Sequence, residues 1–243
     1  MRPQLNSGTL DRPIEMWRRD LAFVLLLCAA CSRRSASPAT TEALASTSTA
    51  PSSSLCHPSG NDLQAVRLDV DEGFIGSHDP SEILDPVWWS GDICNSVVDY
   101  ERCLKPFSRE QRLMYALLWY QYEVDNGGHD QFFFNSTGIV FPDALLALRE
   151  LGLAEGVAIL SEAGRRMGGT AARDRDERQR QLETIHPEFD DLDSKFYALD
   201  KTANLEATMI AYMRSHASAF RFHGTVQVPR ASLEIRKRLT QIK

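Results

Sequence analysis

The sequence predicts an all-α fold, a compact multi-helix bundle preceded by a signal peptide and a disordered tether. Three observations support this prediction. Apolar side chains recur every three or four residues in several segments, which is the period of a buried helix face. The strict alternation of half-buried strands is nearly absent. A stretch rich in Ser, Thr, Ala and Pro separates an apolar leader from the rest of the chain.

The leader, residues 1–30, resembles a secretion signal that starts at Met1 or at Met16. Its apolar segment, residues 21–30, has about ten residues, whereas a helix that spans a bilayer needs about twenty. The segment ends in Cys-Ala-Ala before Cys31, and this sequence resembles a bacterial lipobox. The sequence therefore predicts that Cys31 is lipidated and becomes the first residue of the mature protein.

Lipidation of Cys31 would make the membrane a partner of the chain, because attached acyl chains insert into a bilayer. Ser32, not Asp, follows the cysteine. By similarity to lipoproteins of this kind, the predicted location is the bacterial cell envelope, at the outer membrane and facing the periplasm. The alternatives are an ordinary cleaved signal and an uncleaved N-terminal tail.

Four regions are expected after the signal. Residues 31–54 are poor in large apolar side chains and predict a lipidated, disordered tether. Residues 55–84 are interrupted by Gly and Pro and predict an irregular extension with at most one short strand or helix. Residues 85–223 predict the helical domain. Residues 224–243 predict a basic C-terminal tail in which residues 233–242 form a loosely docked helix.

The central helix of the domain is expected to begin at Arg109. Ser108 is followed three residues later by Gln111, which is the spacing of a capping box. Apolar residues then surround most of the rod, as in a helix packed on several neighbours. Gly127 and Gly128 are expected to end it, because glycine reaches the left-handed conformation of a helix C-cap. A second helix is expected to restart there.

Further helices are expected around this pair. Pro142 suits the first turn of a helix, and the segments at 157–167 and 205–213 carry apolar residues at helical spacing. Residues 173–180 have mixed charges and are expected to form a solvated loop or an exposed helix start.

The strongest motif lies at the double glycine and just beyond it. It resembles the signature of a family of small all-helical bacterial proteins of unknown function, whose best-known member is described as a DNA mimic, and the resemblance covers roughly residues 85–222. The matching residues are Glu123, Val124, Asp125, Asn126, Gly127, Gly128, Gln131, Phe132, Phe133, Asn135, Ser136 and Gly138. The resemblance implies a helical fold more firmly than it implies an activity.

Two roles are open for the polar residues of this motif. They can cap helix ends and satisfy backbone groups at the corner, which is the favoured interpretation. Alternatively they line a shallow recognition pocket beside Trp119. The candidate residues are Glu123, Asn126, Gln131 and Asn135, together with Gly127 and Gly128.

No established catalytic motif is present, so the sequence favours a binding role while leaving enzymatic activity open, and it predicts no catalytic residue, cofactor or metal ligand. Glu123, Asp125 and His129 offer carboxylate and imidazole groups for a metal- or carboxylate-dependent hydrolase, which is kept as an alternative. Because the net charge is −6 at pH 7, nucleic acid is not expected as a direct ligand.

Cysteines and acidic residues give two further candidates. In an oxidising periplasm two of Cys56, Cys94 and Cys103 can pair, and the nine-residue separation favours Cys94 with Cys103. A second cluster can imitate the spaced phosphates of a duplex, or can simply be a solvated helix start. It consists of Glu188, Asp190, Asp191 and Asp193.

These observations predict an envelope lipoprotein that carries a helical protein-interaction module with an unknown protein partner. An immunity-type protein would be a special case of this function. The resemblance suggests an alternative, an acidic DNA-mimic-type regulator of a DNA-binding protein. An envelope location argues against that alternative, because transcription factors act in the cytoplasm.

Overall fold

The computed structural model describes residues 62–241, which form twelve α-helices, one 3₁₀ helix and two β-strands. The expected helical fold is therefore confirmed, and the described residues add a small two-stranded sheet. The signal peptide, the tether, Cys31 and Cys56 lie outside the described residues. In chain order the elements are β1 (Leu63–Val70), α2 (Glu72–Ser77), α3 (Pro80–Ile83), α4 (Asp85–Ser90), α5 (Val97–Leu104), α6 (Arg109–Phe134), η1 (Ser136–Val140), α7 (Phe141–Glu150), α8 (Ala154–Arg166), α9 (Arg175–Ile185), α10 (Asp190–Ala203), α11 (Leu205–Ser215), α12 (Ala217–Phe220), β2 (Phe222–Pro229) and α13 (Arg230–Gln241).

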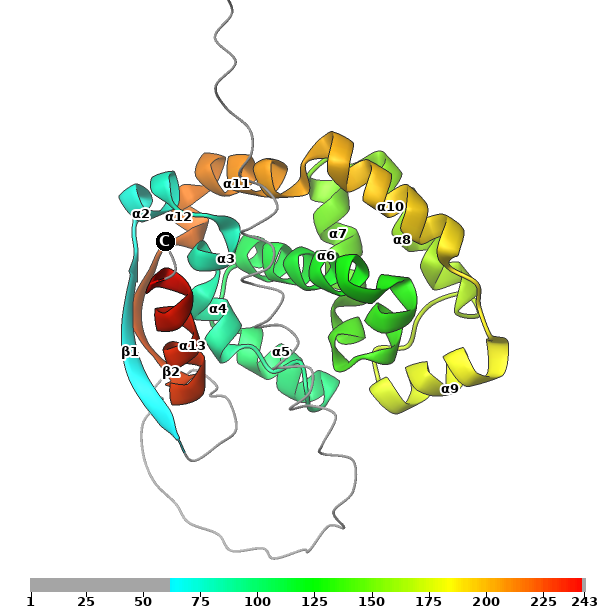
Figure 1. Cartoon of the computed structure of the whole chain (residues 1–243), viewed down its shortest axis with the longest axis horizontal. Coiled ribbons are helices and arrows are strands. Elements are labelled where there is room, and N and C mark those ends of the chain that lie inside the picture. Colours follow the sequence, from blue (N-terminus) through cyan, green and yellow to red (C-terminus); the bar gives the residue numbers. More distant parts are fainter. Residues whose placement is uncertain (1–61, 242–243) are drawn as a thin grey trace, which may run out of the picture.

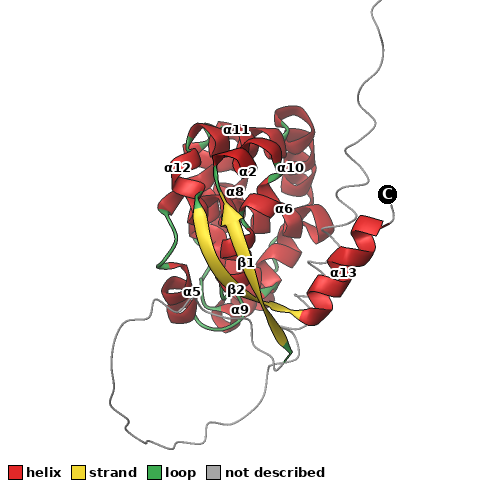
Figure 2. Cartoon of the chain, turned by 90° about the vertical axis from the view of Figure 1, so that its left-hand side faces the viewer, coloured by secondary structure: helices red, strands yellow, loops and turns green. Residues whose placement is uncertain are grey.

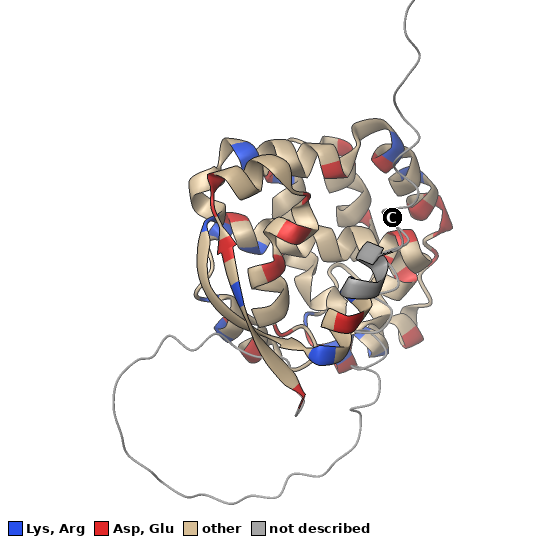
Figure 3. Cartoon of the chain, turned by 60° about the vertical axis from the view of Figure 1, so that its left-hand side comes forward, with Lys and Arg blue, Asp and Glu red and all other residues tan. Residues whose placement is uncertain are grey.

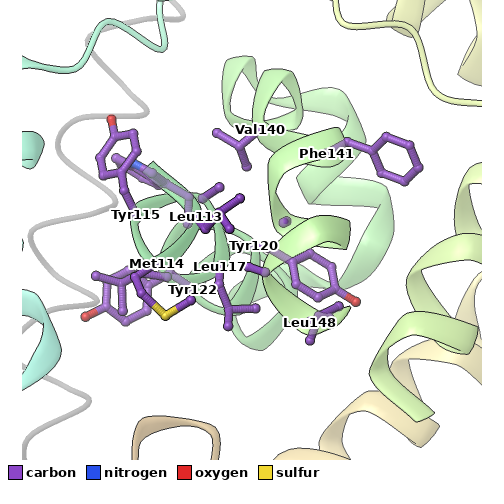
Figure 4. Packing of buried hydrophobic residues seen from close by; sticks show 14 of the residues in the cluster. Leu113, Met114, Tyr115, Leu117, Tyr120, Tyr122, Val140, Phe141 and Leu148 are labelled. Carbon is purple, nitrogen blue, oxygen red and sulfur yellow. The ribbon is translucent and has the colours of Figure 1, made fainter. Parts of the chain in front are cut away.

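Helix α6 runs through the centre of the molecule, and the other helices are arranged around it (Figure 1). Its side chains point outward on several sides, and those of Leu113, Met114 and Tyr120 are almost completely buried (Figure 4). A helix that is apolar on most of its circumference is stable in water only when neighbours cover it. Helices α7, α9, α10 and α12 and the 3₁₀ helix η1 contact α6.

Local sequence signals place the ends of these elements as expected. The Ser108 hydroxyl accepts a hydrogen bond from the Gln111 backbone N–H at 3.0 Å, and the Gln111 side chain accepts one from the Ser108 backbone N–H at 3.0 Å. This capping box begins α6 at Arg109. Pro142 lies in the first turn of α7, where its missing N–H costs no helical hydrogen bond.

The two strands pair antiparallel and bring the ends of the described chain together, with Leu63 opposite Pro229 and Val70 opposite Phe222. The ribbon lies across one side of the helices (Figure 2). The expected irregular extension contains strand β1 followed by the short helices α2 and α3, and the expected tail contains most of strand β2 followed by helix α13, so the pairing of the two strands is the feature that was not predicted. The partners are more than 150 residues apart, and each carries only a short alternation, such as Val66, Leu68 and Val70, so neither segment is recognisable alone.

Helix α13 docks beside the ribbon with the help of a partly buried ion pair. The Arg236 guanidinium donates two hydrogen bonds to the Asp85 carboxylate, both at 2.6 Å, and lies over the ring of Trp89, 5.2 Å from its centroid. Trp89 also packs with the buried side chains of Val226 and Val228. The ribbon and α13 thus share a small apolar cluster of their own. Acidic and basic positions are mixed over this side of the molecule (Figure 3).

Candidate functional site

The double glycine bends α6 at the centre of the predicted motif. Gly127 has φ −159° and ψ 24°, and Gly128 has φ 74° and ψ −175°, so the helix before them and the helix after them are separate rods. The predicted break and restart are confirmed. Glycine is required at position 128 for two reasons: its φ is left-handed, and a Cβ atom there would collide with the Asp193 carboxylate.

The carboxylate of Glu123 is completely buried next to this bend. It accepts hydrogen bonds from Gln131 Nε2 at 2.7 Å, from Asn135 Nδ2 at 2.9 Å and from Thr137 Oγ1 at 2.8 Å. A buried carboxylate is tolerated when several donors replace the lost water. The three donors come from the part of the chain after the bend, so Glu123 joins the two halves of the corner.

The remaining polar residue of the motif completes the same network. Asn126 Nδ2 donates to Gln131 Oε1 at 2.9 Å, while Gln131 uses its amide nitrogen for Glu123. Hydrogen bonds therefore link Asn126 to Gln131, and both Gln131 and Asn135 to Glu123. Their polar atoms face one another, which is the geometry of groups that hold a corner together.

His129 lies on the other side of the bend and is also completely buried. Its Nδ1 atom is 2.5 Å from Asp193 Oδ1, and its Nε2 atom is 2.9 Å from the Tyr120 hydroxyl. Its backbone N–H donates to the same Asp193 oxygen at 2.9 Å. The rings of Phe133, Phe189 and Phe196 surround the imidazole. Asp193 thereby attaches α10 to the bend of α6.

The convergence of Glu123, Asp125 and His129 that a hydrolase would need is not found. The Glu123 carboxylate is bound to donors after the bend, and His129 is bound to Asp193 and Tyr120. The charge that acts on Asp125 is that of Asp200. Among residues 62–241, no group of three or more His, Cys, Asp and Glu side chains is arranged to hold a metal ion.

The environment of the Asp125 carboxyl group favours its protonated form. Its Oδ2 atom is buried and has no hydrogen-bond partner within the described part of the chain. Burial raises the pKa of the Asp125 carboxyl from 3.8 to about 7, and the nearby charge of Asp200 adds to the effect. Burial also raises the pKa of Asp200, which accepts a hydrogen bond from Gln121 Nε2 at 3.2 Å.

The four residues of the predicted acidic surface have different environments. Glu188 and Asp190 are exposed, while Asp193 turns inward to His129. Asp191 is ion-paired with Arg166 at 2.5 Å and with Lys195 at 3.3 Å.

A fifth acid, Asp130, joins this patch from the bend. Burial raises the pKa of Asp130, and the charges of Asp193, Glu188 and Asp190 raise it further. We refer to Asp130, Glu188, Asp190 and Asp193 as the corner acidic patch. The sequence placed Asp130 at the glycine corner and not with this cluster, because it lies 58 positions before the cluster's first member.

Arg178 was missed by sequence reasoning, because it lies in the mixed-charge segment that was expected to be solvated. It is completely buried and donates to the carbonyl oxygens of Phe133 at 2.7 Å, Asn135 at 2.6 Å and Ala172 at 2.9 Å. These carbonyls include the ones left free where α6 ends. Burial lowers the pKa of Arg178 to about 10, and the charge of Arg175 adds to the effect.

Cys94 and Cys103, the two cysteines within residues 62–241, are both disulfide-bonded. Cys94 lies in the exposed loop before α5, and Cys103 lies on the buried face of that helix. In the same part of the chain no helix is both long enough and apolar enough to cross a membrane.

Comparison with known proteins agrees with this architecture. Comparisons with curated proteins and with solved structures gave no match. The family model described as "DMP19-like protein" matches residues 105–216. The matched segment contains α6 with its bend, the Glu123 network and α10, and it excludes both strands of the ribbon. Residues 105–216, which form most of the helical core of this chain, are therefore a region similar to the DMP19-like family.

Proposed function

We propose that this protein is an envelope lipoprotein whose helical domain binds a protein partner. One observation carries the proposal: the polar side chains of the family motif bind one another and not a solvent-facing cavity. A motif whose polar side chains bind one another stabilises the fold. The binding function is then expected on the surface of the domain and not in the motif itself.

The corner acidic patch is the recognition surface that we assign to this domain. Asp193 fixes the start of α10 against the bend, so Glu188, Asp190 and Asp130 are held close together. Mutual repulsion among these carboxylates is relieved when a cation approaches. The favoured partner is therefore a protein with a basic surface, which electrostatic attraction would bring to the patch.

Location decides between this proposal and the second candidate, an acidic DNA-mimic-type regulator of a DNA-binding protein. The family match favours the second candidate, while the lipobox-like sequence before Cys31 favours the envelope. Oxidised Cys94 and Cys103, which we propose to pair with each other, also favour an oxidising compartment.

Lipid labelling of the wild type and of Cys31→Ala, followed by membrane fractionation, tests the location. Labelling that depends on Cys31 and is sensitive to an inhibitor of lipoprotein processing is expected. An unlabelled protein in the cytoplasm would overturn the envelope proposal and favour the DNA-mimic alternative.

A capture experiment with the full chain tests the surface. Wild-type protein is expected to retain a partner from envelope extracts, and retention should decrease as salt increases. Glu188→Lys with Asp190→Lys should abolish retention. The matched control is Asp176→Lys with Glu177→Lys, which reverses two exposed acids in the first turn of α9. Equal retention by both variants would refute the assignment of the patch.

A further inference from the structure

Strand β1 is the outer strand of the ribbon. Val226 and Val228 of β2 are buried, and β2 is in contact with α4 and α13. On β1, by contrast, Gln64, Ala65, Arg67 and Asp69 are exposed, and only Val70 is buried. Within residues 62–241 the sheet has two strands, so β1 pairs with β2 along one edge only.

The register identifies the backbone groups at the second edge. The Arg230 N–H donates to the Asp62 carbonyl at 3.0 Å, so residue 62 directs its backbone groups toward the opposite strand. Because this direction alternates along an antiparallel strand, residues 64, 66, 68 and 70 also face β2. Residues 63, 65, 67 and 69 present their N–H and C=O groups to the outer edge. Unpaired groups of this kind are a template for another strand.

We propose that this edge pairs with β1 of a second copy of the chain, antiparallel and about a two-fold axis at Leu68, to form a four-stranded sheet. In this register Arg67 of each copy lies directly opposite Asp69 of the second copy. Both belong to the outward-facing set, so they form hydrogen-bonded pairs across the axis. The two side chains are exposed, at 68% and 53%, and they now pair with each other along the same strand at 3.2 Å.

Charge selects this register over its neighbours. A two-fold axis at Arg67 would place the two Arg67 guanidinium groups opposite each other, and like charges directly opposite destabilise a strand pair. An axis at Val66 would place Arg67 opposite Ala65 and Asp69 opposite Leu63, so neither charge would face its opposite. The axis at Leu68 also places Leu68 opposite itself and Val66 opposite Val70, which are apolar cross-strand pairs.

Charge reversal tests the interface in the full chain, kept in mild detergent and measured by sedimentation equilibrium. The wild type is expected to form a reversible dimer. Arg67→Asp and Asp69→Arg should each raise the dimer dissociation constant about tenfold or more, because two attractive pairs become repulsive. Arg165→Asp is the matched control, because Arg165 is 69% exposed and also pairs with an acid near it in sequence, Glu162. It should leave the dimer unchanged.

Mixing the two single variants separates pairing from folding. A mixed dimer of Arg67→Asp with Asp69→Arg has opposite charges at both positions, so the mixture should dimerise as tightly as the wild type although neither variant does so alone. Circular dichroism checks that each variant is folded. Three results would overturn the proposal: a wild type that remains monomeric, single variants that dimerise normally, or a mixture that remains monomeric. A monomer whose edge is covered by its own residues 1–61 or by another protein would give the first result.

Discussion

The corner of α6 and the terminal ribbon both contain polar groups that need partners inside the fold, but the partners lie at different distances along the chain. At the corner, buried polar groups find partners close in sequence or on helices within the DMP19-like region, as Glu123 does with Gln131 and Asn135. At the ribbon, the main polar contact joins Asp85 to Arg236, 151 residues later. The corner lies in the main hydrophobic core, whereas the ribbon and α13 share a small separate apolar cluster. Loss of a buried polar contact should therefore destabilise the whole fold at the corner and mainly the local structure at the ribbon.

The largest expected effect is at Arg178, on the corner side. Arg178→Met removes the hydrogen bonds to the carbonyls of Phe133, Asn135 and Ala172, and each buried group left unsatisfied costs about 1–3 kcal/mol. We expect the free energy of unfolding, measured by urea denaturation, to decrease by about 4 kcal/mol. Arg165→Met, on an exposed face of α8, serves as the control and should change it by less than about 0.5 kcal/mol.

The second effect is at Gly128. Gly128→Ala places a Cβ at a left-handed φ of 74° and against the Asp193 carboxylate, so α10 must move away from the bend. A loss of about 3 kcal/mol is expected by the same measurement. Gly152→Ala is the matched control, because its φ is 69° and nothing lies within 4 Å of the added carbon. It should cost only about 1 kcal/mol, and equal losses would show that the Asp193 contact is unimportant.

The corner and the ribbon also differ in how far the sequence predicted them. The bend, the capping box at Ser108 and the start of α7 follow from local rules about glycine, serine and proline, and they were predicted correctly. The strands were missed, because pairing of Leu63 with Pro229 is a long-range contact with no local signature. Arg178 was missed because a charged residue in a mixed-charge segment gives no local signal that its side chain will be buried.

Within the candidate site, the sequence identified the residues and not their partners. It placed Glu123, Asp125 and His129 near one glycine corner, but it could not show that they diverge. The directions in which the side chains around a bend point depend on the φ and ψ angles of Gly127 and Gly128, and glycine can adopt several combinations of these angles. The partner of His129, Asp193, lies 64 positions later on a different helix, and only the folded chain brings them together.

A third, intermediate effect is expected at the ribbon. Arg236→Met leaves the buried Asp85 carboxylate without its cation, which should cost about 2 kcal/mol. Amide hydrogen exchange should show faster exchange in β1, β2 and α13 while α6 remains protected. Replacing both partners, with Asp85→Leu added, should recover part of the loss, because no buried charge then remains unpaired. Faster exchange throughout α6 in the single variant would show that the ribbon and the core unfold as one unit.

The last effect, which is the smallest when counted per pH unit, concerns the pH dependence of stability and belongs to the corner. The pKa of Asp125 is about 7 in the folded chain and 3.8 ordinarily, so between these values the folded state keeps a proton that the unfolded state has lost. The free energy of unfolding should therefore decrease as pH rises from about 4 to about 7, by up to about 1.4 kcal/mol per pH unit from this group. Asp125→Asn should remove this contribution and flatten the profile, whereas Asp176→Asn, on the exposed side of α9, should leave the slope unchanged. Urea denaturation at pH 5, 6 and 7 measures all three proteins. If the profile of Asp125→Asn followed that of the wild type, the proton would reside elsewhere, and the buried Asp85 of the ribbon, whose pKa is also raised by burial, would be the next group to test.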